Sequence, residues 1–131
     1  MSDDISTNEL ENMRKMTQSY INEFDEIDGK ISNLVKNSAT KTGTMLEEYP
    51  EEIQKSILDG RDKALSTGFI AISTIALIIR RFRTASKLVD LFIQLINRFV
   101  SLITRYEKLF KIDSVQVTTS LTPSVVITFK P

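Results

Sequence analysis

The stretch that decides the fold is GFIAISTIALIIRRFRTASKLVDLFIQLINRFVSLI, residues 68–103, in which two strongly apolar segments flank a cluster of positive charge. Pro is absent from residues 51–110, and the only glycines there are Gly60 and Gly68. Because little in this range opposes helix, it predicts either one helix of about 60 residues or two helices broken near residues 83–86. We prefer the interpretation with two helices.

The first apolar segment, residues 64–79, carries no charge and lies between Lys63 and Arg80. As a helix it would span about 24 Å, somewhat less than the roughly 30 Å hydrocarbon core of a bilayer. Hydroxyl residues form a stripe that repeats every seven positions: Ser66, Thr67, Ser73 and Thr74. Small residues of this kind permit close helix packing in lipid and in a soluble bundle alike.

The second apolar segment carries a narrow polar line, whose members are spaced three and four residues apart. The line consists of Lys87, Asp90, Gln94, Asn97, Ser101, Thr104 and Lys108, with Arg98 and Arg105 beside it. A helix that is apolar around most of its circumference must be enclosed. Either lipid encloses it and the polar line faces a lumen, or protein encloses it and the line faces solvent. The residues expected to contact the membrane or the core are Phe69, Ile72, Ile75, Ile79, Leu91, Phe92, Ile96, Phe99 and Ile103.

The N-terminal part predicts an amphipathic helix with a defined start. Ser6 and Glu9 form a capping box, and Ile5 and Leu10 form a hydrophobic staple, so the helix should begin at Thr7. A coiled-coil seam follows, with residues spaced 4, 3, 4 and 3 apart: Tyr20, Phe24, Ile27, Ile31 and Leu34. This seam predicts packing against a partner helix, including a heterologous one.

The chain therefore divides into four predicted parts. They are a coiled-coil helix at residues 1–46, a turn at 47–50, an apolar helical segment at 51–111 and a pair of β-strands at 112–131. Val115, Val117, Thr119 and Leu121 alternate with polar residues, a turn follows at Thr122-Pro123-Ser124, and Val125, Ile127 and Phe129 alternate again. The expected fold is mainly α, a long helical hairpin or bundle with a short C-terminal β-hairpin. Because an isolated hairpin is marginally stable, these strands should pair with other copies or be covered by a helix.

Charge is distributed unequally along the chain, although the net charge is zero. Residues 1–62 carry 14 acids and 7 bases, whereas residues 63–131 carry 3 acids and 10 bases. The acidic half should pack along the basic half, and the basic half also suits anionic lipid. The residues expected at an anionic surface are Arg80, Arg81, Arg83 and Lys87. Nucleic acid is not an expected partner, because Phe82 is the only aromatic residue among these cations.

Composition argues against an enzyme. The chain has no Cys, His or Trp, which removes thiolate and imidazole chemistry, and its four glycines form no phosphate-binding or dinucleotide motif. We expect no catalytic residue, no cofactor and no metal site. The acidic N-terminus, MSDDISTNEL, is also unlike a signal peptide.

Two functions fit these features, and both involve self-assembly. The first is a homo-oligomer that inserts into or anchors on a membrane, of the pore-forming or lysis type. The alternative is a soluble structural subunit of a larger particle, such as a virion or secretion apparatus, in which the apolar helices form a protein core. The location is accordingly a membrane or a macromolecular particle.

Overall fold

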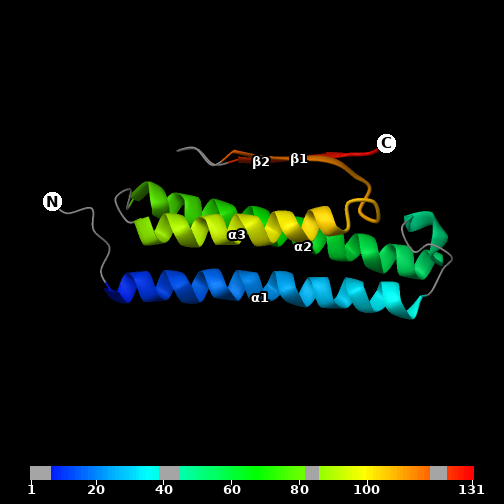
Figure 1. The fold of residues 1–131 in the computed structure, drawn as a ribbon, viewed down its shortest axis with the longest axis horizontal. Helices are drawn as coiled ribbons and strands as arrows, with labels where there is room; N and C mark the ends of the chain where they lie inside the picture. The colour runs from blue at the N-terminus through cyan, green and yellow to red at the C-terminus, as the bar shows by residue number, and fades with distance from the viewer. Residues whose placement is uncertain (1–6, 39–44, 82–85, 119–123) are drawn as a thin grey trace.

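A computed structural model of the protein describes residues 7–38, 45–81, 86–118 and 124–131. Its elements in chain order are α1 (Thr7–Asn37), the 3-10 helix η1 (Leu46–Glu48), α2 (Glu51–Arg81), α3 (Ser86–Arg105), β1 (Ile112–Thr118) and β2 (Ser124–Phe129). The three long helices pack as a bundle in which each contacts the other two, and the hairpin lies on the side of α2 and α3 away from α1 (Figure 1). The predicted fold class is confirmed.

Helix α1 begins at Thr7, as the capping box predicts, although Ile5 and Ser6 themselves lie outside the described residues. Its seam is turned toward the other two helices. Phe24, Ile27 and Ile31 are buried, and Tyr20 and Leu34 are half-buried. The partner helices of this seam are therefore α2 and α3 of the same chain.

The reversal between α1 and α2 includes a short 3-10 turn that buries Leu46 and Tyr49. Pro50 directly precedes α2, and its carbonyl accepts the first backbone hydrogen bond of the helix from Gln54, at 2.9 Å. The Gln54 side chain also donates to the Tyr49 carbonyl at 2.7 Å. Because Pro lacks an N–H, this place before the first turn costs it no hydrogen bond.

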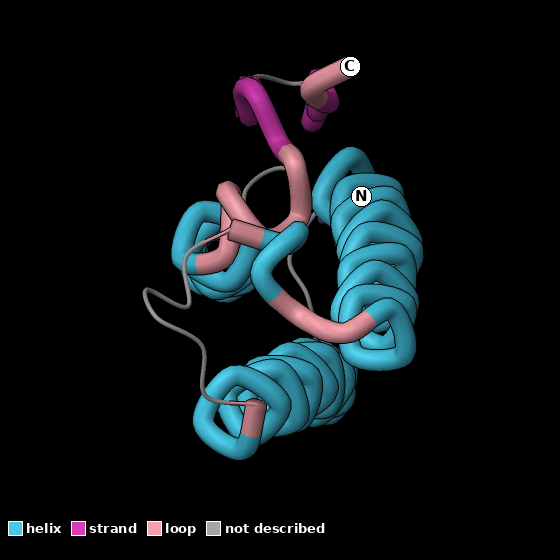
Figure 2. The backbone as a smooth tube through the Cα atoms, turned by 90° about the vertical axis from the view of Figure 1, so that its right-hand side faces the viewer, coloured by secondary structure: helices cyan, strands magenta, loops and turns pink. Residues whose placement is uncertain are grey.

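The long apolar segment forms two helices, and the alternative of one continuous helix is wrong. Helix α2 ends at Arg81 and α3 begins at Ser86, and the two run side by side in opposite directions (Figures 1 and 2). At Gly68, the Phe99 ring of α3 packs against the α2 backbone. A side chain at residue 68 would occupy the space of that ring.

The hairpin pairs β1 with β2 in antiparallel register, with Val115 opposite Ile127 and Val117 opposite Val125. These four side chains are half-buried against the helical core, so one face of the hairpin lies on the bundle. The expected turn and the residues before it, 119–123, lie outside the described residues. Both strands thus pair within one chain and are covered by helices.

The connection between α3 and β1 depends on one unusual backbone position. Lys111 has a φ of 54°, in the left-handed region that non-glycine residues seldom adopt. Its carbonyl accepts a hydrogen bond from the Lys130 N–H at 2.8 Å, and its ammonium lies 2.6 Å from the Glu47 carboxylate. These contacts hold the turn that directs the chain back over the helices.

Candidate interaction surface

Most residues predicted to contact a membrane or a core lie in the interior of the bundle. The buried ones are Ile72, Ile75, Phe92, Ile96, Phe99 and Ile103, and the half-buried ones are Ile79 and Leu91. Phe99 lies at the centre, with its ring 5.6 Å from that of Phe24 and 6.4 Å from that of Phe69. Among the predicted contacts, Phe69 is the exception, because 43% of its surface is exposed.

The polar line of α3 faces solvent. Its five central residues are all exposed: Asp90, Gln94, Asn97, Ser101 and Thr104. The Thr104 hydroxyl donates back to the Val100 carbonyl at 2.8 Å, as hydroxyl groups on exposed helix faces often do. This orientation corresponds to enclosure of α3 by protein, with its apolar side turned toward α1, α2 and the hairpin.

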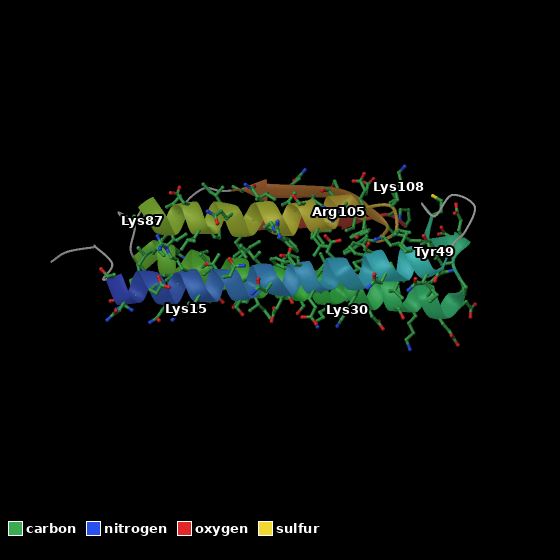
Figure 3. The ribbon with its side chains drawn as sticks, turned by 60° about the horizontal axis from the view of Figure 1, so that its bottom comes forward. Lys15, Lys30, Tyr49, Lys87, Arg105 and Lys108 are labelled. Carbon is green, nitrogen blue, oxygen red and sulfur yellow. The ribbon has the colours of Figure 1, made fainter. Side chains whose placement is uncertain are left out.

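Two arginines beside the polar line connect α3 to the acidic face of α1. Arg98 pairs with Asp25, and Arg105 pairs with Asp28 at 2.5 Å. Figure 3 shows Arg105 on the side of α3 that faces α1. Surface ion pairs contribute only about 0–1 kcal/mol each, so their main effect is to orient the two helices. The acidic half of the chain therefore packs along the basic half within one subunit.

Asp28 also accepts a hydrogen bond from the Tyr106 hydroxyl, at 2.5 Å. Burial and this hydrogen bond raise the pKa of Tyr106 from 10.0 to about 12, because both disfavour the phenolate. The carboxylate of Asp28 likewise raises the pKa of Arg105, since a neighbouring negative charge favours the guanidinium. The three side chains form one polar cluster at the end of α3.

We expect Tyr106→Phe to reduce the loss of stability that the protein undergoes between pH 10 and about 12. In this range the unfolded chain has lost the phenol proton and the folded chain retains it. The contribution of the Tyr106 phenol to the free energy of unfolding is thus fully present below pH 10. It disappears as the pH rises through the pKa that this phenol has in the folded state. Urea unfolding of both proteins at increasing pH measures the difference. Equal declines in the two proteins would contradict the prediction.

The outward face of α2 is uncharged for about three turns and exposes large apolar side chains. It is formed by Ser66, Phe69, Ile70, Ser73 and Leu77. Ile70 and Leu77 leave 57% and 65% of their surface exposed. We call these five residues the α2 face. Contiguous apolar exposure of this kind typically marks an interaction site.

Charged residues stand at both ends of the α2 face. Asp59 and Asp62 are exposed on the N-terminal side, and Arg80 and Arg81 are exposed on the C-terminal side. Lys87 of α3 is exposed at the end of the bundle opposite Tyr49 (Figure 3). Three of the four predicted anionic-surface residues are thus exposed, and the fourth, Arg83, lies outside the described residues.

Ile70 and Leu77 were absent from the predicted contacts, although the sequence contains a signal for them. Ser66, Ile70, Ser73 and Leu77 are spaced 4, 3 and 4 residues apart, which places them along one side of a helix. The hydroxyl stripe is divided accordingly. Ser66 and Ser73 are exposed, whereas Thr67 and Thr74 are half-buried.

A groove of about 560 Å³ lies between the C-terminal part of α1 and the N-terminal part of α2. Its apolar lining includes Ile27, Ile31 and Ile53, and Gly60 allows Ile31 to approach α2 closely. Lys30 and Lys63 lie at its edge. Across the described ranges, no group of three His, Cys, Asp or Glu side chains is arranged to hold a metal ion.

Comparison of the chain with known protein families, curated proteins and solved structures finds no match. Among the described helices, only α2 is long and apolar enough to cross a membrane, and core helices of soluble proteins have the same length and composition. In the most apolar stretch of 18 residues in α2, 33% of the residues are buried in the bundle. The geometry of the α2 face is therefore the main indication of function.

Proposed function

We propose that the protein is a non-enzymatic structural subunit that assembles with other copies of itself through the α2 face. The apolar helices form the core of each subunit in this proposal. The observation that carries it is the exposure of Ile70 and Leu77 on a helix face that has no charge from Ser66 to Leu77. An exposed apolar face between charged ends is typical of a surface that another protein covers.

The contacts of α3 favour this function over insertion of the helices into lipid. Arg98 and Arg105 engage Asp25 and Asp28 of α1, and the polar line faces outward. Insertion would require these ion pairs to separate and the charged side chains to lie at membrane depth. Each charge facing hydrocarbon costs several kcal/mol. Enclosure by protein satisfies the same side chains without that cost.

We expect Leu77→Glu to weaken self-association at least tenfold while the subunit stays folded. The glutamate would place a charge in the covered interface, whereas in the free subunit its position is 65% exposed. Sedimentation velocity over a range of concentrations measures the association, and circular dichroism reports the fold. Gln94→Glu is the matched control, because it adds the same charge on the exposed polar line of α3.

Two results would contradict the proposal. One is a wild-type protein that stays monomeric at the highest soluble concentration, whether or not it binds vesicles. The other is an oligomer that Leu77→Glu and Gln94→Glu affect equally, which would exclude the α2 face as the contact.

A second function, membrane anchoring, is favoured by the composition of α2 and by the cations at one end of its face. Arg80, Arg81 and Lys87 are exposed where anionic headgroups would lie if the α2 face entered the membrane surface. Flotation with vesicles of neutral and of anionic lipid separates this function from self-assembly. Anchoring predicts flotation that requires anionic lipid and that Leu77→Glu abolishes.

A further inference from the structure

We infer that the α2 helices of two copies pack antiparallel, face to face, about a two-fold axis that passes between residues 71 and 72. This inference rests on the proposed self-assembly and specifies its interface. It requires that the α2 face complements itself when one copy is turned end to end. The size and the charge of its side chains both meet that requirement.

Small and large side chains alternate along the line Ser66, Ile70, Ser73 and Leu77 of the α2 face, and Phe69 lies at the edge of this line. Ser66 and Ser73 are small, and Ile70 and Leu77, which lie between and after them, are large and exposed. When two copies run antiparallel about the inferred axis, Ile70 of each comes level with Ser73 of the other. Leu77 of each likewise comes level with Ser66 of the other. Every large side chain then meets a small one, as close packing of two helices requires.

A parallel arrangement lacks this complementarity. Each residue would lie level with its own equivalent, so Leu77 would meet Leu77 and Ser66 would meet Ser66. Gaps would then remain where serine lies level with serine. Atoms that line such a gap lose van der Waals contacts, which weakens the interface.

The charged ends of the α2 face favour the same orientation. Asp59 and Asp62 lie at one end, and Arg80 and Arg81 lie at the other. An antiparallel pair brings Asp62 of one copy, which also pairs with Arg61 of its own chain at 3.1 Å, level with Arg81 of the other. Lys63 comes level with Arg80 of the other copy, and this repulsion is offset by the two acids beside Lys63. In a parallel pair, acids would face acids and arginines would face arginines.

The surface is also held in a defined shape before association. Phe69, at the edge of the face, packs edge-on against the buried Phe99 ring, with the centroids 6.4 Å apart. Helix α2 forms one side of the bundle, and α1, α3 and the hairpin lie on its other sides (Figure 2). A second copy can therefore approach α2 without rearrangement of the subunit.

Cysteine cross-linking tests the arrangement, because the chain contains no native Cys. About the inferred axis, the two copies of residue 73 are offset along the helices by about 4.5 Å, and the two copies of residue 66 by about 16 Å. We therefore expect a short bifunctional thiol reagent to yield at least fivefold more dimer with Ser73→Cys than with Ser66→Cys. An equimolar mixture of Ser66→Cys and Leu77→Cys should give the mixed dimer.

The outcomes distinguish the inference from the function on which it rests. Equal cross-linking of Ser66→Cys and Ser73→Cys would overturn the antiparallel arrangement and indicate a parallel one. Absence of cross-links in an oligomer whose association Leu77→Glu still weakens would overturn the antiparallel arrangement and leave assembly through the α2 face standing. A monomer that floats with anionic vesicles would overturn both and assign the α2 face to lipid.

Discussion

Phe99→Ala is expected to lower the free energy of unfolding by about 3–5 kcal/mol, the range for large aromatic side chains removed from a core. Phe99 has no exposed surface, and its ring packs on Phe24 of α1 and on Phe69 and Gly68 of α2. Its removal would leave a cavity where the three helices meet. Urea unfolding followed by circular dichroism measures the change.

Phe129→Ala is the matched control, since it removes the same side chain from a position that is 45% exposed. The Phe129 ring lies on the hairpin beneath the Arg61 guanidinium, 5.0 Å from the ring centroid. We expect it to cost about 1 kcal/mol or less. Equal losses in the two variants would mean that Phe99 is not the centre of the core.

Gly68→Ala is expected to destabilise the bundle by about 1–3 kcal/mol, although Ala is the better helix former by about 1 kcal/mol. A Cβ at residue 68 would lie 2.6 Å from the Cδ1 and Cζ atoms of Phe99, well inside van der Waals contact. Either the ring or α2 would have to move. Thermal and urea unfolding would detect the loss.

Gly29→Ala supplies the control for this prediction. Gly29 also lies within a long helix, but nothing is within 4 Å of the place its Cβ would occupy. This variant should gain about 1 kcal/mol from helix propensity alone. In the Phe99→Ala background, Gly68→Ala should become neutral or stabilising, because the overlapping ring is gone. If Gly68→Ala still destabilised the Phe99→Ala protein, overlap with the Phe99 ring would not be the cause.

The helices and strands were largely predictable because their signals are local. The capping box predicted a helix start at Thr7, where the described part of α1 begins, and alternation at Val115, Val117, Val125 and Ile127 marked the strands. The α1 seam was also evident from its spacing. Periodicity identifies an apolar stripe but not what covers it, so the sequence could not decide between partners inside and outside the chain.

The outward face of α2 could not be chosen from hydropathy, because apolar residues surround most of that helix. Its orientation is set by tertiary contacts with α1 and α3, which include the packing of Phe99 on Gly68. For α3, the sequence did not distinguish enclosure by lipid from enclosure by protein. The pairing of Arg98 and Arg105 with α1 depends on helix positions that no local pattern encodes.

The position of the hairpin also lay beyond sequence reasoning. It depends on Lys111, whose φ of 54° is rarely adopted by lysine. The sequence around Lys111 contains no turn motif that would predict this conformation. The contact of Arg61 with the Phe110 carbonyl, at 3.1 Å, joins residues 49 positions apart in the chain. Such long-range contacts determine how the hairpin lies on the helices.

Vesicle flotation of protein purified without detergent is the measurement that decides whether α2 and α3 form a protein core. We expect a folded, helical oligomer that stays in the soluble fraction with neutral and with anionic vesicles. Protein that requires detergent for solubility, or that floats with the vesicles, would instead show that the apolar helices contact a membrane.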